Sequence, residues 1–156
     1  MGAARPFSWK GRRLRTVLQR SIAYRRELER PWAPYRWRGH GWDWVLDEPP
    51  HGTWSFVELT SGEKLFREGS HMKHCVASYA GRCASGHSAI VSVRHKDDRR
   101  LTVEIEPCTR SVVQARGPFN RSADAEEQEV ISLWARSVLR ADMSNEADRA
   151  VPPGRD

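Results

Sequence analysis

The sequence predicts an α+β domain in which an antiparallel meander of three to four strands is packed on one face by helices, with a basic amphipathic helix ahead of it. Two observations carry this prediction. Residues 89–116 contain three segments in which apolar and polar residues alternate, separated by turn-forming residues. Residues 75–85 and 124–140 instead repeat apolar residues at three- and four-residue spacing, which is the period of a helix.

The first forty residues hold most of the positive charge, with 11 Lys or Arg against 2 Asp or Glu, a net +9. The rest of the chain carries −3, and the total is +6. Residues 12–30 gather aliphatic side chains on one stripe and arginines elsewhere, which predicts the basic amphipathic helix. Such a segment indicates a polyanionic partner, nucleic acid before membrane; a solvated basic helix is the alternative. The candidate nucleic-acid-binding residues are Arg12, Arg13, Arg15, Arg20, Arg25 and Arg26.

The chain divides into three predicted parts. Residues 1–50 form the basic helix and a tryptophan-rich loop, residues 51–140 form the α+β domain, and residues 141–156 form a frayed tail. Tryptophans in the loop, residues 31–52, either stack on nucleic-acid bases or, as is more common, pack a small satellite core. The chain has no run of about 18 apolar residues and no patterned cysteines, so we expect a cytoplasmic protein without membrane insertion.

The predicted elements follow one another through the domain. A short strand over residues 54–59 precedes a helix that begins at a capping box of Thr60 and Glu63 and ends at Gly69. The later elements are a helix over residues 75–85, three strands over Ala89–Arg94, Leu101–Glu106 and Ser111–Arg116, and a final helix over Asp124–Arg140 with Asp124 and Glu127 at its cap.

Residues in the middle of the chain are similar to those of a known family. The matching positions are Glu68-Gly69, Met72, His74-Cys75-Val76, Ser78-Tyr79, Gly86, Thr102-Val103-Glu104-Ile105, Gln114-Ala115-Arg116-Gly117 and Asn120-Arg121. In this order and spacing they resemble the PcfJ-like family over about residues 54–140. The family takes its name from a plasmid conjugation protein, and its members occur on plasmids, phages and bacterial chromosomes. The resemblance therefore implies a partner in a conjugation or phage protein complex; it implies no particular reaction, and any cofactor is unknown.

Cys75, in the first motif (residues 68–79), is a candidate nucleophile. At the start of the predicted helix, free backbone N–H groups and the helix dipole would favour its thiolate form. His71 and His74 lie close enough in sequence to act as a base or an orienting group. The alternative is a small buried core residue, because Cys75 shares a helical stripe with Tyr79.

The same segment does not predict a metal site. His71, His74, Cys75 and Cys83 offer nitrogen and sulfur ligands, but their spacing matches no zinc signature. His74 and Cys75 are adjacent, and adjacent residues on a helix point about 100° apart. A closed tetrahedral site built from this segment alone is therefore not expected.

The second motif, residues 114–121, predicts recognition. Strand alternation places Gln114 and Arg116 on one polar face, beside Glu104 on the neighbouring strand. With the loop before the last helix, they predict a cradle for a phosphate or another polar ligand. The alternative is structural: Glu104 pairs across the sheet with Gln114 or Arg116, and the asparagine caps the turn. The candidate ligand-binding residues are Glu104, Gln114, Arg116, Gly117, Asn120 and Arg121.

Both motifs meet in one cleft if the Cys75 helix packs near the open end of the meander. This shared cleft would hold six residues: His74, Cys75, Glu104, Gln114, Arg116 and Asn120. The leading interpretation is a nucleic-acid-associated accessory protein of bacterial mobile elements, in which the basic arm binds phosphates and the two motifs form a recognition site. The alternative is an enzyme that acts on a phosphate-containing substrate. Cys75 would be its nucleophile and His74 or His71 its base, and Arg116 would stabilise an anionic transition state. A protein–protein adaptor in a transfer complex is the second alternative.

Overall fold

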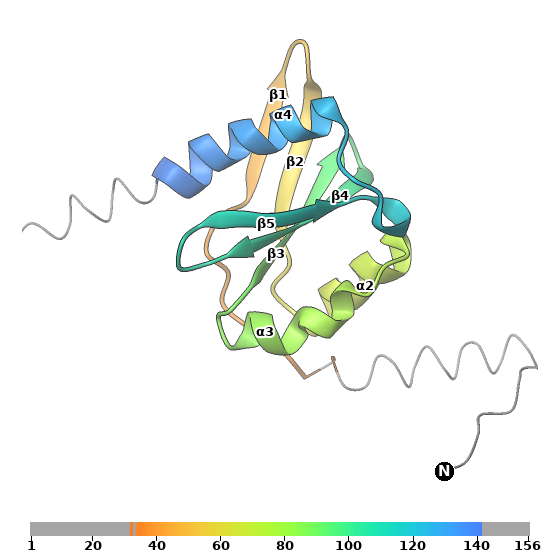
Figure 1. Ribbon diagram of the computed structural model, residues 1–156, viewed down its shortest axis with the longest axis vertical. Helices are drawn as coiled ribbons and strands as arrows, with labels where there is room; N and C mark the ends of the chain where they lie inside the picture. Colours follow the sequence, from red (N-terminus) through yellow and green to blue (C-terminus); the bar gives the residue numbers. More distant parts are fainter. Residues whose placement is uncertain (1–31, 33, 142–156) are drawn as a thin grey trace, which may run out of the picture. The chain divides into compact units, whose positions relative to one another are not determined.

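Five strands form one antiparallel sheet in which every strand pairs with its neighbours in the sequence (Figure 1). The computed structural model describes Trp32 and residues 34–141, all in one compact unit. The α+β class and the meander are confirmed. The strands are β1 (Trp44–Glu48), β2 (Gly52–Glu58), β3 (Ala89–His95), β4 (Asp98–Glu106) and β5 (Ser111–Arg116).

The number of strands differs from the three to four expected, because β1 lies in the segment predicted as a loop. β1 is an edge strand that pairs with β2, from Trp44 opposite Phe56 to Glu48 opposite Gly52. Within β1 only Leu46 is buried, so the strand lacks the alternation of buried apolar and exposed polar residues that would have predicted it. The predicted basic helix, with the six candidate nucleic-acid-binding arginines, and the predicted tail from residue 142 onward lie outside the described residues.

Helices cover both faces of the sheet, whereas the sequence predicted them on one. Successive side chains of a strand point to opposite faces. Ala89 and Val91 of β3 belong to the core beneath one set of helices, while Ile90 belongs to the core beneath the other. The apolar Ile90 thus sits on the face that otherwise appeared polar. One face carries α4 (Ala125–Trp134) and its π-helical extension η3 (Ala135–Leu139), and the other carries α2 (Gly62–Met72), the 3-10 turn η1 (Val76–Tyr79) and α3 (Ala80–Ala84).

The core under α4 is built around aromatic rings. Trp134 stacks on Phe56 of β2 with ring centroids 4.9 Å apart, and its Nε1 donates to the backbone oxygen of Trp42 at 3.0 Å. All three side chains are at most 2% exposed. Trp42 comes from the tryptophan-rich segment, so that segment contributes to the main core and not only to a satellite cluster.

α2 begins one residue later than predicted and continues past Gly69. Ser61 caps it, because its Oγ accepts from the Lys64 backbone N–H at 3.2 Å. The helix ends at Lys73, whose φ of 57° turns the chain back. The helix includes Gly69, where a side chain does not fit because a Cβ would lie 2.7 Å from the His74 carbonyl oxygen. This close return directs His74 toward the sheet.

α4 carries the predicted capping box. Asp124 Oδ1 accepts from the Glu127 backbone N–H at 2.9 Å, and Glu127 Oε2 accepts from the Asp124 N–H at 3.0 Å. In the wider π turn at the end of the helix, Leu139 is buried, whereas Val138 is only partly buried. Within residues 34–141, no helix combines the length and apolar character needed to cross a bilayer.

Candidate functional site

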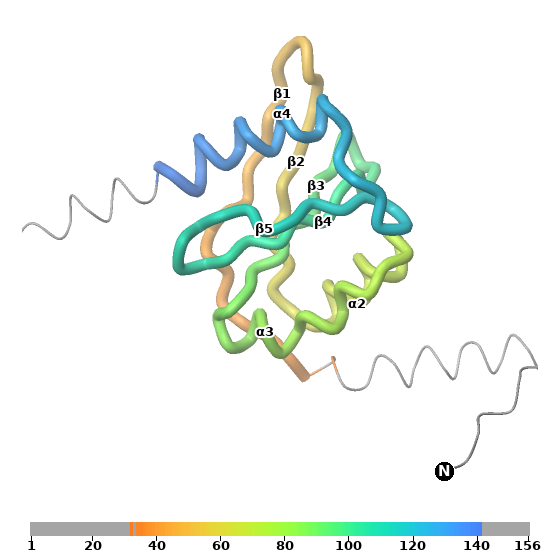
Figure 2. The backbone as a smooth tube through the Cα atoms, in the orientation of Figure 1, coloured from red at the N-terminus to blue at the C-terminus, as the bar shows by residue number. Residues whose placement is uncertain are grey.

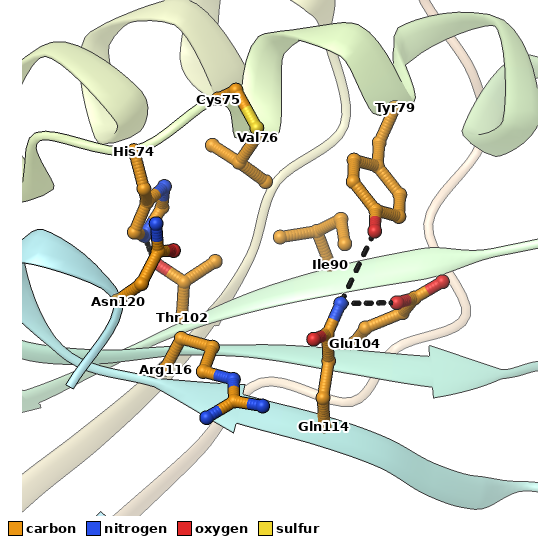
Figure 3. A pocket seen from close by; sticks show the side chains of 10 residues that line it. All are labelled: His74, Cys75, Val76, Tyr79, Ile90, Thr102, Glu104, Gln114, Arg116 and Asn120. Carbon is orange, nitrogen blue, oxygen red and sulfur yellow. Dashed lines mark hydrogen bonds between the residues drawn. The ribbon is translucent and has the colours of Figure 1, made fainter. Parts of the chain in front are cut away.

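The two motifs face each other across a pocket of about 460 Å³ (Figure 3). Small-ligand sites commonly have volumes of roughly 300–1,000 Å³. One wall is the chain around η1, the floor is the polar face of β4 and β5, and the loop after β5 closes one side. The lining residues are His74, Cys75, Val76, Tyr79, Ile90, Thr102, Glu104, Gln114, Arg116 and Asn120. The six residues that the sequence analysis placed in one cleft are all among them.

Gln114 is held in one orientation in this pocket. Its Nε2 donates to Glu104 Oε2 at 2.8 Å and to Tyr79 Oη at 3.1 Å. Because an ionised carboxylate only accepts hydrogen bonds, the amide nitrogen must face Glu104. The Gln114 carbonyl is therefore the acceptor offered to a ligand, and the Tyr79 hydroxyl keeps its own proton for donation.

Glu104 orients Gln114 and Ser88 by hydrogen bonds, and its carboxylate is too buried to offer much charge to a ligand. It is 4% exposed, accepts from Ser88 Oγ at 2.9 Å, and lies 3.5 Å from Arg82 Nη2. The Arg82 guanidinium also lies 5.3 Å from the centre of the Tyr79 ring. The cross-strand pairing of Glu104 with Gln114 is thus present, and it builds the pocket floor.

Arg116 supplies the exposed positive charge of the pocket. It lies opposite Thr102 in the β4–β5 register and lines the pocket beside Gln114 (Figure 3). Its Nη1 donates to Ser122 Oγ at 3.5 Å, and among the described residues it has no carboxylate partner. Most of its guanidinium donors are therefore available to an anion.

His74 is connected to a buried carboxylate through one hydroxyl. Thr102 Oγ1 donates to Glu68 Oε1 at 3.0 Å and lies 3.0 Å from His74 Nε2. Glu68, fully buried in α2, also accepts from Arg99 Nε at 2.8 Å. Since the single hydroxyl proton of Thr102 goes to Glu68, His74 Nε2 must be the donor to Thr102. The Nδ1 atom of the neutral ring is then its basic nitrogen.

The protonation of His74 follows from its surroundings. Burial lowers the pKa of His74, and the charge of Glu68 and a backbone hydrogen bond at His74 offset only part of that shift. The ring is therefore neutral at pH 7. It can accept a proton or a hydrogen bond at Nδ1.

The cysteines occupy different environments. Cys75 is exposed and lines the pocket, which is at odds with the core-residue alternative. It precedes a four-residue 3-10 turn, and within the described part of the chain no hydrogen bond joins its sulfur to His74. Cys83 is buried, and burial with the negative charge of Glu104 raises the pKa of its thiol to about 12. Cys83 is thus an inert core thiol.

Three predicted site residues lie elsewhere. His71 and Arg121 line a second pocket and not the first, so His71 is not placed to act as a base for Cys75. Arg121 binds the buried Glu127 with both terminal nitrogens, at 2.6 and 2.7 Å. Gly117 accommodates that side chain, because a Cβ there would lie 2.7 Å from Arg121 atoms. Gly117 and Arg121 therefore support the loop. Residues 34–141 hold no group of three or more His, Cys, Asp or Glu that could bind a metal ion.

Sequence reasoning did not assign Glu68, Thr102 or Tyr79 to the site, although all three are among the positions that resemble the family. Glu68 lies between Leu65 and Met72 on the apolar stripe of α2, and a charge on a buried stripe signals a buried partner. That signal could have identified Glu68. Its partners could not be identified in this way, because they lie on the sheet, about thirty residues further along the chain.

The fold is a small α+β domain, a five-stranded meander with helices on both faces. Its pocket lies between one face of the sheet and the chain around a 3-10 turn. The chain belongs to the PcfJ-like protein family, whose sequence model matches residues 48–131, more than half of the chain. No curated protein and no solved structure matches the chain.

Proposed function

We propose that this PcfJ-like protein binds nucleic acid in the bacterial cytoplasm as an accessory factor of mobile elements, and that the pocket receives one nucleotide of the strand. The observation that carries the proposal is Arg116. It is an exposed guanidinium without a described carboxylate partner, on a pocket whose own carboxylate, Glu104, is buried and hydrogen-bonded. Guanidinium groups in such settings bind phosphate well, and phosphate contacts supply much of the affinity for nucleic acid.

The other lining groups suit the rest of a nucleotide. The Gln114 carbonyl accepts, the Tyr79 hydroxyl donates, and the Asn120 amide can do both. Val76 and Ile90 add apolar surface beside them. In this proposal the net charge of +9 in the first forty residues adds sequence-independent phosphate affinity.

The substitution Arg116→Ala is expected to weaken binding and to reduce the slope of log affinity against log salt concentration by roughly one phosphate contact. Fluorescence anisotropy with a labelled oligonucleotide at several salt concentrations measures both quantities. Arg136→Ala is the matched control. Arg136 is equally charged and exposed, but it lies on η3, on the opposite face of the sheet. An equal loss in both variants would contradict a pocket contact.

Neutralising Arg12, Arg13, Arg15 and Arg20 together tests the basic arm in the same assay. We expect a larger drop in affinity and in salt slope than Arg116→Ala produces, because up to four phosphate contacts are lost. Wild-type protein that binds no nucleic acid, or binds it independently of salt, would overturn the proposed function.

A cysteine-dependent enzyme is a second candidate, favoured by one observation: the exposed Cys75 lines the same pocket as the neutral His74. This candidate predicts that iodoacetamide at neutral pH modifies Cys75 much faster than Cys108. Cys108 is an exposed cysteine on the β4–β5 turn and serves as the internal control. Mass spectrometry of the two peptides over time gives both rates. Similar rates would argue against a nucleophile, and failure of both proposals would favour the protein–protein adaptor.

A further inference from the structure

Phe119 is the most exposed large apolar residue of the described chain, at 78%. It stands directly before Asn120, which lines the pocket, and three residues after Arg116. Its backbone φ is 56°, in the left-handed region that bulky side chains rarely enter. The ring therefore gains little from burial, and its backbone conformation is unfavourable.

The turn itself does not call for phenylalanine. Arg121 N–H donates to the Pro118 carbonyl at 3.2 Å, and Phe119 and Asn120 between them both have positive φ, which is a type I′ turn. Type I′ turns favour asparagine, aspartate or glycine at both central positions. Asn120 fits this preference, whereas Phe119 does not.

The turn is held firmly in place beside α2 (Figure 2). Gly117 N–H donates to the Arg121 carbonyl at 2.9 Å, which closes the loop. The Arg121 guanidinium binds both oxygens of Glu127, whose side chain is 1% exposed. The loop is thus fixed to the capping box of α4, and Phe119 is presented to solvent on a supported backbone.

We infer that Phe119 is a stacking platform for an unpaired base of single-stranded nucleic acid, with a neighbouring phosphate of the same strand on Arg116. An exposed aromatic ring three residues along the chain from an available guanidinium offers the two groups that an unpaired nucleotide needs, one for the face of the base and one for the phosphate. A duplex hides its base faces inside the stack, so it offers only the phosphate. This inference rests on the proposed function and specifies its ligand.

The test uses two variants of the full chain. Phe119→Asn removes the ring but suits the turn, so we expect it to unfold at or above the wild-type temperature. Phe119→Trp keeps an aromatic face. Fluorescence anisotropy is measured with labelled oligothymidylate, oligouridylate, the same DNA strand carrying abasic sites, and a duplex. We expect Phe119→Asn to weaken binding to both intact single strands by roughly 5- to 150-fold, while binding to the abasic strand and the duplex stays within about twofold because phosphate contacts remain. We expect Phe119→Trp to bind like the wild type.

The outcomes separate this inference from the proposed function. Unchanged single-strand binding in Phe119→Asn overturns the stacking role. A wild-type preference for duplex over single strand also overturns stacking, but leaves nucleic-acid binding standing. Wild-type protein that binds none of the four probes overturns both.

Discussion

Replacing Trp134 with alanine is expected to lower the free energy of unfolding by about 5 kcal/mol. The ring is fully buried, stacks on Phe56, and donates its N–H to the Trp42 carbonyl. Alanine leaves a large cavity in the core under α4 and an unsatisfied buried carbonyl. Small domains have roughly 5–15 kcal/mol of stability in total, so this loss removes about a third of it or more. Urea unfolding followed by far-UV circular dichroism measures the loss.

Trp134→Phe is the matched control. Phenylalanine can keep the stacking on Phe56 but loses the N–H group, and we expect a loss of about 1–2 kcal/mol. The difference between the two variants then reports the packing of the ring. A loss below about 2 kcal/mol in the alanine variant would contradict a fully buried Trp134, since buried Trp→Ala substitutions commonly cost 3–5 kcal/mol.

Replacing Arg121 with alanine is expected to lower the free energy of unfolding by about 3 kcal/mol at pH 7. The substitution leaves the Glu127 carboxylate buried and removes two of its shortest hydrogen bonds. Removing one partner of a buried pair commonly costs 3–5 kcal/mol, and the lower end applies here because the Arg121 side chain is 38% exposed and Arg100 Nε remains 3.1 Å from Glu127. Urea unfolding at several pH values measures the effect.

The pH dependence identifies the carboxylate. Burial raises the pKa of Glu127, but hydrogen bonds from Arg121, from the Asp124 backbone and from Arg100 outweigh it and hold the pKa below its ordinary value. Because the folded pKa is the lower one, the stabilisation is complete above the unfolded value of about 4.3 and is lost as the pH falls through the folded pKa. The difference between wild type and Arg121→Ala should therefore shrink in the acid range.

Arg67→Ala is the control for this ion pair. Arg67 and Glu63 pair at 2.6 Å on the surface of α2, with both side chains more than half exposed. The distance matches that of the Arg121–Glu127 pair, but water solvates the surface pair. The expected loss is therefore below about 0.5 kcal/mol. Losses of similar size in Arg121→Ala and Arg67→Ala, or a difference independent of pH, would show that Glu127 is solvated.

The sequence predicted the strands whose two faces differ in polarity. The bounds of β5 match the structure, and Gln114 lies opposite Glu104 on the polar face as alternation required. The alternation fails at Val113, which is 56% exposed because a bulge interrupts the β4–β5 register. β1 was missed because an edge strand with one buried residue has no alternating signal.

The candidate site was only partly accessible to sequence reasoning. Gln114 and Arg116 followed from strand alternation, and His74 and Cys75 lie with them on one pocket. The sequence predicted Arg121 as a ligand-binding residue for the same reason as Arg116, since both are arginines in the second motif. The structure separates them, because Glu127 binds Arg121 while Arg116 has no described carboxylate partner.

The sequence by itself determined the family, the α+β class, the meander, the capping box of α4 and the polar face that carries Gln114 and Arg116. The family rests on motifs spread over residues 68–121. The other features are properties of neighbouring residues or of residues a few positions apart, and local sequence patterns indicate them. Only the tertiary structure decided which charged side chains have an oppositely charged partner. Glu68 meets Arg99 thirty-one positions away, and Glu127 meets Arg100 twenty-seven positions away. Such pairings depend on how helices pack on the sheet, and that packing decides which side chains remain available to a ligand.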